Sequence, residues 1–168
     1  AGNDTIQAGR GINLITTGPG VDTIVYAQAF APHRSDITDF SPGVGGDVLQ
    51  FSRGALGLAN GGAAISGSTD VDTGAFNNLK NNVDVFLVTG IAFASDAAME
   101  QKVADDDDAA GALVILYFNS TDKSTHVLYD PVAQAANTPA SRLGRLINVS
   151  SQSAHDSINV GSNLSSGQ

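Results

Sequence analysis

Residues 2–26 read GNDTIQAGRGINLITTGPGVDTIVY, and this stretch repeats with a period of nine residues. Each unit reads as a glycine-containing turn, an acidic or amide residue and a short strand. Three columns of residues share the period: Gly2, Gly11 and Gly20; Asp4, Asn13 and Asp22; Ile6, Ile15 and Ile24. A fixed period is the signature of a repeat architecture, in which similar units stack on one another.

The repeat predicts a short parallel β-roll. Glycine supplies turn dihedrals that other residues avoid, and the isoleucine of each unit points inward from a short strand. Two units complete one coil, so units two apart stack at the strand spacing of about 4.8 Å. The Asp4 turn is therefore expected directly beside the Asp22 turn.

This stacking predicts a metal site in which the two aspartates share one ion. Main-chain carbonyls of the turns at Gly2, Gly18 and Gly20 would supply further oxygens. A site of roughly six to eight oxygens suits Ca²⁺. Asn13 is a further candidate ligand, but it lies on the opposite edge of the roll, without a stacked partner there. The alternative is a glycine-rich turn cluster that binds no ion.

These units resemble the nonapeptide Gly-Gly-x-Gly-x-Asp-x-apolar-x of the RTX (repeats-in-toxin) family of calcium-binding exoproteins. The units depart from that pattern at Ala8, Asn13 and Thr17, and the first unit lacks its opening three positions. Terminal repeats are usually atypical, which agrees with these departures. Because the sequence begins inside a repeat, we expect it to be a piece of a longer protein.

Residues 35–52 read as strand, turn and strand with alternating apolar residues. They resemble the element that closes RTX rolls in secreted alkaline proteases and their relatives. The resemblance implies that three apolar side chains, Phe40, Leu49 and Phe51, cover the open end of the roll. It also offers three acidic candidates for a further ion, although they serve equally well as turn and strand-edge carboxylates: Asp36, Asp39 and Asp47.

The middle of the chain has weaker signals. Residues 54–82 are rich in Gly, Asn, Ser and Thr, so we expect a long loop with at most short elements. Residues 84–88 and 91–94 predict two strands, and Ser95 predicts the N-cap of a short helix that ends near Ala104. The four carboxylates at 105–108 indicate either a solvated loop or a surface calcium site.

Residues 112–118 form the most strongly predicted strand, with a hairpin turn and a returning strand at 125–130. Two more strands are predicted at 143–149 and 157–160. This order is similar to the C-terminal region of RTX exoproteins, in which the last apolar strand carries an uncleaved type I secretion signal. The polar tail 161–168 and the Pro131 segment depart from the family, so no ion is assigned there.

The predicted fold is therefore mainly β: a short parallel β-roll followed by a capping, β-sandwich-like region with one or two short helices. The expected divisions are the repeats (1–28), the roll-capping strands (29–53) and a β-rich C-terminal region with the secretion signal (54–168).

Composition restricts the partners. The 168 residues carry a net charge of -9, with sixteen Asp, one Glu and no Cys. A negative charge of this size repels nucleic acid and anionic lipid, so neither is an expected partner. The longest apolar run, residues 112–118, is far shorter than the roughly 20 residues of a membrane-spanning helix, so no membrane insertion is expected. Without cysteine there is no disulfide framework and no thiolate site.

Catalysis by this chain is not predicted. Its three histidines, His33, His126 and His155, are far apart in the sequence, and Ser66 lacks the spacing of a nucleophile elbow. His126 is expected to be a surface or half-buried residue of a strand and not a ligand. Arg142 and Arg145 are expected to form ion pairs, and Tyr117, Phe118 and Tyr129 to pack in the hairpin.

The resemblance implies a calcium-binding C-terminal module of a larger RTX exoprotein, which folds in Ca²⁺ after type I secretion. The partners would be calcium ions and the ABC-transporter secretion apparatus, and the location would be outside the cell or on its surface. The alternative is a Ca²⁺-dependent surface-layer or adhesin module that binds itself or a cell-surface glycan. A part of a secreted hydrolase is the least favoured interpretation.

Overall fold

The computed structural model describes residues 1–27, 33–59, 63–67, 83–105, 111–131, 140–161 and 163–167. The chain is mainly β, as predicted. The described residues form strands β1 Thr5–Gln7, β2 Ile12–Ile15, β3 Thr23–Tyr26, β4 Arg34–Ile37, β5 Val48–Ser52, β6 Ala63–Gly67, β7 Val83–Phe93, β8 Leu113–Asn119, β9 Ser124–Asp130, β10 Ser141–Leu146 and β11 Leu164–Gly167. They also form helices α1 Arg53–Leu56, α2 Asp96–Ala104 and α3 Gln152–Asp156. None of the helices in the described part of the chain has the length and apolarity needed to cross a membrane.

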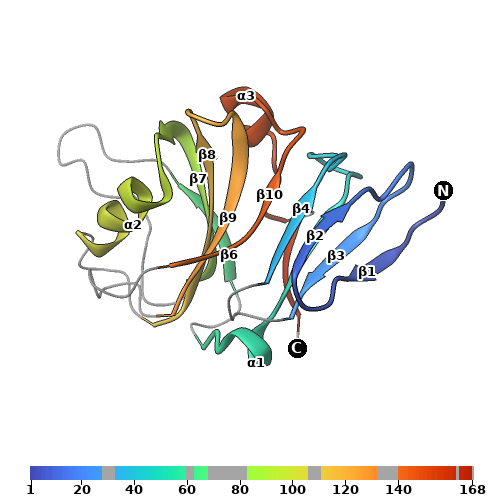
Figure 1. Ribbon diagram of the computed structural model, residues 1–168, viewed down its shortest axis with the longest axis horizontal. Coiled ribbons are helices and arrows are strands. Elements are labelled where there is room, and N and C mark those ends of the chain that lie inside the picture. The colour runs from blue at the N-terminus through green and yellow to red at the C-terminus, as the bar shows by residue number, and fades with distance from the viewer. Residues whose placement is uncertain are drawn as a thin grey trace.

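The strands form two sheets. The four-stranded sheet has the order β1-β3-β5-β11, and all its pairs are parallel. The seven-stranded sheet has the order β2-β4-β10-β9-β8-β7-β6, with antiparallel pairs only around β9. The first five strands alternate between the two sheets, and Figure 1 shows these coils at the opposite end of the molecule from α2. Strands from all three predicted divisions take part in these sheets.

The register confirms the expected stacking of residues eighteen apart. Thr5 pairs with Thr23 and Ile6 with Ile24 in the four-stranded sheet. Ile24 is buried, and Ile6 packs against the same core, because both side chains point between the sheets. The nine-residue period therefore corresponds to one strand and one turn.

Two hydrophobic cores hold the layers together. The larger lies between the sheets, where Ile24 and Phe51 of one sheet meet Leu116 and Leu143 of the other. The smaller lies between the seven-stranded sheet and α2, whose Met99 is fully buried. The three predicted capping side chains are all buried in the larger core: Phe40, Leu49 and Phe51.

The hairpin of β8 and β9 confirms the strongest strand prediction, with Asn119 opposite Ser124. The helix predicted after Ser95 is also present, and the Ser95 side chain accepts a hydrogen bond from the amide of Ala98. In the region expected to be a loop, the described residues contain α1 and β6, whereas 60–62 and 68–82 lie outside them.

Several element predictions are wrong. Residues 83–93 form one strand, not two, because Gly90 has φ 74 and the register shifts there without ending β7. Residues 157–160 are not a strand, since Ser151 caps α3 and the chain turns after it. The last strand is instead β11, in the segment expected to be a polar tail. Three helices are present in the described residues where one or two were expected.

Candidate functional site

Asp22 is the most unusual acidic residue in the glycine-rich turns. It ends the turn between β2 and β3, and its side chain is fully buried. Its Oδ1 accepts a hydrogen bond of 2.8 Å from the amide of Asp4. Its Oδ2 is buried and has no hydrogen-bond partner among the described residues. Burying a carboxylate oxygen without a donor or a cation is costly, so this atom is the first candidate for a cation ligand.

The turn before β1 lies directly against the turn of Asp22. The amide of Thr23 donates to the carbonyl of Asp4 at 2.8 Å, and the amide of Val21 donates to Asn3 Oδ1 at 3.0 Å. Together with the bond from Asp4 to Asp22, these contacts tie the two turns at three points. The expected neighbours Asp4 and Asp22 are therefore brought together, and Asn3 joins them although the sequence analysis did not select it.

The glycines of these turns have the backbone conformations that the repeat predicts. Gly2, Gly18 and Gly20 all have positive φ, at 116, 87 and 153°. A Cβ on Gly20 would lie 2.1 Å from the carbonyl oxygen of Gly2. Glycine at this position is therefore what allows the two turns to stack.

Asp47 continues the line of turn carboxylates into the next coil. Its Oδ1 accepts the amide of Asp22 at 2.9 Å, and its Oδ2 accepts the amide of Ser41 at 2.8 Å. Both oxygens of this buried side chain are therefore engaged by main-chain donors. This geometry favours the role of a turn carboxylate over that of an ion ligand.

Asp39 is engaged in the same way. Its Oδ1 accepts the amide of Thr17 at 2.9 Å and its Oδ2 the amide of Gly18 at 2.8 Å. Burial acts to raise the pKa of Asp39, but the hydrogen bonds from Thr17 and Gly18 outweigh it and lower the pKa. Asn13 lies apart from these turns, on the opposite edge, where its Nδ2 donates to the carbonyl of Gly9.

Asp36 is separate from the turns and lies on β4. Its Oδ2 is 2.7 Å from Arg145 and 3.1 Å from Arg34. Two guanidinium groups already neutralise this buried carboxylate, and their charge disfavours a cation there. The ion pairing expected of Arg142 and Arg145 is present, since Arg142 pairs with Asp96.

Asn163 ends the line of turn residues, and the sequence analysis missed it. Its Nδ2 donates to the carbonyls of Asp47 and Gly43, at 2.7 and 2.8 Å. Its Oδ1 accepts the amides of Gly43 and Asn159. The signal was present in the sequence: Gly161 and Asn163 have the same spacing as Gly20 and Asp22.

A second polar cluster lies around His126. The prediction that this residue lies at or near the surface is wrong, because its side chain is only 1% exposed. Nδ1 is 2.6 Å from Asp96 Oδ1, and Nε2 is 2.8 Å from Asp122 Oδ2. The ring therefore lies between two carboxylates, which only accept hydrogen bonds. The Tyr117 hydroxyl donates to the same Asp96 oxygen, which fixes α2 to the sheet.

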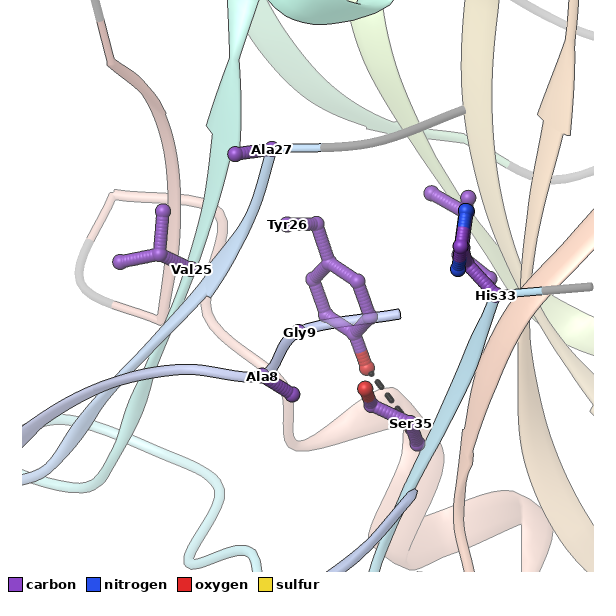
Figure 2. Close-up of a pocket in the computed structure, with 8 residues that line it drawn as sticks. Ala8, Gly9, Val25, Tyr26, Ala27, His33 and Ser35 are labelled. Carbon is purple, nitrogen blue, oxygen red and sulfur yellow. Dashed lines mark hydrogen bonds between the residues drawn. The ribbon is translucent and has the colours of Figure 1, made fainter. Parts of the chain in front are cut away.

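A small pocket of about 20 Å³ is lined by residues of β3, β4 and β10. Figure 2 shows the Tyr26 side chain crossing this pocket, with its hydroxyl donating to the carbonyl of Ser35 at 3.1 Å. Burial, and then the charge of Asp36, raise the pKa of Tyr26, so the phenol stays neutral. This volume accommodates about one water molecule and no organic substrate.

No group of three or more His, Cys, Asp or Glu side chains suited to a metal occurs within the described ranges. A calcium site completed by main-chain carbonyls does not need a third acidic side chain. Of the acidic run at 105–108, only Asp105 is described; it caps α2 and accepts from Gln101. Asp106, Asp107 and Asp108 lie outside the described residues.

Comparisons with protein-family models, curated proteins and solved structures each returned no match. The choice of a function therefore depends on the residues and contacts of this chain.

Proposed function

We propose that this chain is a calcium-binding β-roll module, with its site between the turns of Asp4 and Asp22. The observation that carries the proposal is the fully buried, unpartnered Oδ2 of Asp22 among the described residues. The two carboxylates would hold the ion, together with main-chain carbonyls of the turns at Gly2, Gly18 and Gly20. Bound there, Ca²⁺ would supply positive charge to the buried Oδ2 of Asp22, which has no donor among the described residues.

Two features support a parallel β-roll capped by the C-terminal region. The chain alternates between two sheets from β1 to β5, and residues eighteen apart are paired in parallel. The remaining strands extend the seven-stranded sheet and add β11 to the other one. Calcium fits such a site better than zinc because every available ligand is an oxygen.

The role of this site would be folding that depends on Ca²⁺. Without the ion, the buried charge of Asp22 opposes formation of the first coil. Binding to the folded state alone adds RT ln(1 + [L]/Kd), about 2.7 kcal/mol at a hundredfold excess of ligand. A chain that folds only where calcium is plentiful suits export in an unfolded state.

From this role and the resemblance of the repeats, we infer an RTX exoprotein module. Type I secretion would deliver it to the cell exterior or surface, where Ca²⁺ is plentiful. This module itself would act without catalysis.

The variant D22N tests the calcium site. Asparagine keeps the oxygen that accepts from Asp4 but removes the buried charge. In chelator, we expect D22N to be at least as stable as the wild type. In Ca²⁺, the wild type should gain thermal stability and D22N should not.

The control is D156N, which changes an exposed carboxylate outside the turns. It should keep the full response to calcium. Calorimetry that detects no heat on titration of the wild type with Ca²⁺, or a D22N response equal to that of the wild type, would overturn the proposal.

A second candidate function is Ca²⁺-dependent assembly on a cell surface. The observation that favours it is the 70% exposure of both Ile12 and Leu14, on β2 at the edge of the seven-stranded sheet. Light scattering distinguishes the two, because assembly predicts a mass that rises with calcium concentration. A monomer at every concentration favours the folding module.

A further inference from the structure

The last described strand, β11, completes the four-stranded sheet. It lies parallel to β5, with Leu164 opposite Leu49 and Ser166 opposite Phe51. Leu164 is buried in the core between the sheets. Residues from the C-terminal part of the chain are thus an integral strand beside the coils of the repeat.

Hydrogen bonds connect this strand to the Asp22 turn through one intermediate residue. Asp22 donates its amide to Asp47 Oδ1 at 2.9 Å, and it accepts the amide of Val48 at its own carbonyl at 2.7 Å. The carbonyl of Asp47 accepts Asn163 Nδ2 at 2.7 Å. Asn163, fully buried, immediately precedes β11.

The side-chain amide of Asn163 determines what the last turn can bind. It donates to two carbonyl oxygens and accepts from two backbone amides, so its hydrogen-bond partners among the described residues are main-chain groups. A carboxylate there could not donate, and it would face the carbonyls of Gly43 and Asp47. The last turn is therefore built to hold the C-terminal segment and not a cation.

We propose that calcium binding at the Asp22 turn fastens β11 onto β5, so that the C-terminal segment is sequestered only in the calcium-bound state. This inference rests on the proposed function. Loss of the ion weakens the turn of Asp22, which is bonded to Asp47, and Asp47 holds Asn163. β5 is also the neighbour of both β3 and β11, so disorder in the first coils exposes one edge of the strand that holds the segment.

The consequence is a change in accessibility that follows the calcium concentration. At low calcium, residues 163–167 would be free for recognition by an export apparatus. At high calcium, residues 164–167 would be paired along β5. Export and folding would then exclude each other at this segment.

Hydrogen exchange on the full-length chain tests the proposal. We expect amides of residues 164–167 to exchange about tenfold more slowly in Ca²⁺ than in chelator, within the usual range of coupling between sites. Calcium titration by calorimetry on the same sample reports whether the ion binds. Both experiments use the wild-type protein, so misfolding of a variant cannot hide the result.

The outcomes separate the two proposals. Heat of binding with unchanged exchange at 164–167 would overturn the sequestration of β11 and leave the calcium site intact. No heat and no thermal stabilisation would remove the calcium site and this inference with it. Heat of binding together with slower exchange supports both.

Reciprocity gives a second test. Coupling between two sites is symmetric. If calcium slows the exchange of β11 amides by a given factor, a change that detaches β11 must raise the Kd for calcium by the same factor. N163L removes the amide donors and should raise the Kd for calcium about tenfold. The control is N148D. The side chain of Asn148 also donates to a main-chain carbonyl, that of Phe40, but it is not among the hydrogen bonds that connect Asp22, Asp47 and Asn163. An unchanged Kd in a folded N163L would contradict the coupling.

Discussion

The amide of Asp4 donates to the carboxylate of Asp22, eighteen residues later, at 2.8 Å. This bond joins two consecutive turns on the same side of the molecule. It uses one oxygen of a fully buried carboxylate and leaves the other without a donor among the described residues. The same side chain therefore stabilises the stacked turns and introduces an uncompensated charge between them.

Close stacking of the turns predicts that G20A strongly lowers the stability of the fold. The added Cβ would meet the carbonyl oxygen of Gly2 at 2.1 Å, and φ of 153° disfavours any side chain. We expect a loss of about 2–3 kcal/mol in the free energy of unfolding. Denaturant unfolding at a fixed calcium concentration measures it. G9A is the control, because a Cβ there meets nothing within 4 Å, and an equal loss in both variants would refute the stacking argument.

The cluster around Asp96 predicts sensitivity to acid. Burial acts to raise the pKa of Asp96, but hydrogen bonds from His126, Tyr117 and Arg142 outweigh it and hold the pKa well below its usual range. The folded-state pKa is depressed, so this stabilisation is present above the unfolded pKa of about 3.9 and is lost as pH falls through the folded value. Urea unfolding between pH 7 and pH 3 should show D96N losing less stability than the wild type on acidification. Parallel curves would contradict this assignment.

His126 predicts a loss of stability when its ring is removed. H126Q cannot contact both Asp96 and Asp122 as the ring does, so one of the two carboxylates loses its contact with residue 126. Both carboxylates are partly exposed, so we expect a loss of about 2 kcal/mol in the free energy of unfolding, below the value for a fully buried pair. The control is H33Q, since the His33 ring accepts one bond among the described residues, from the amide of Gly11. If H126Q were as stable as the wild type at pH 7, the His126 ring would not contribute to stability.

His155 predicts a second dependence of the stability on pH. Its Nε2 lies 2.7 Å from the carbonyl of Val88 and its Nδ1 lies 2.9 Å from the Thr125 hydroxyl, as in a neutral ring with the proton on Nε2. Burial lowers its pKa, although the bond to Val88 opposes this. Since the folded pKa is depressed, stability should fall as pH drops below the unfolded value of about 6.5. Nitrogen chemical shifts of the ring at pH 7 would test the tautomer; a doubly protonated ring would contradict it.

The sequence predicted those elements whose signals are local. The nine-residue period defines the stacked turns and the inward isoleucines, and the apolar run at 112–118 defines β8. The helix after Ser151 has an N-cap serine of the same kind as Ser95, so it was also predictable from the sequence. Polar clusters were not predictable, because His126 and Asp96 are thirty positions apart and meet only after α2 folds over the sheet.

The residues of the candidate site also differ in how far the sequence predicts them. Asp4 and Asp22 follow from the period, whereas the sequence offered Asp36, Asp39 and Asp47 without deciding their role. For Asp36 the contacts that determine it come from Arg145 on another strand and from Arg34 on the same strand. For Asp39 and Asp47 they come from main-chain amides. Arg145 and the amides of Thr17, Gly18 and Asp22 are distant in the sequence from the carboxylates that they bind, so no local pattern indicates these contacts.

The pairing of β11 with β5 also restricts the order of folding. Gly43 and Asn163 are bonded to each other across 120 positions, so the four-stranded sheet cannot close until nearly all of the described chain is available. Contacts between such distant residues slow folding, because the entropy of closing the intervening loop is lost before they form. A chain that emerges gradually from a ribosome would therefore keep one edge of β5 open until residues 164–167 arrive.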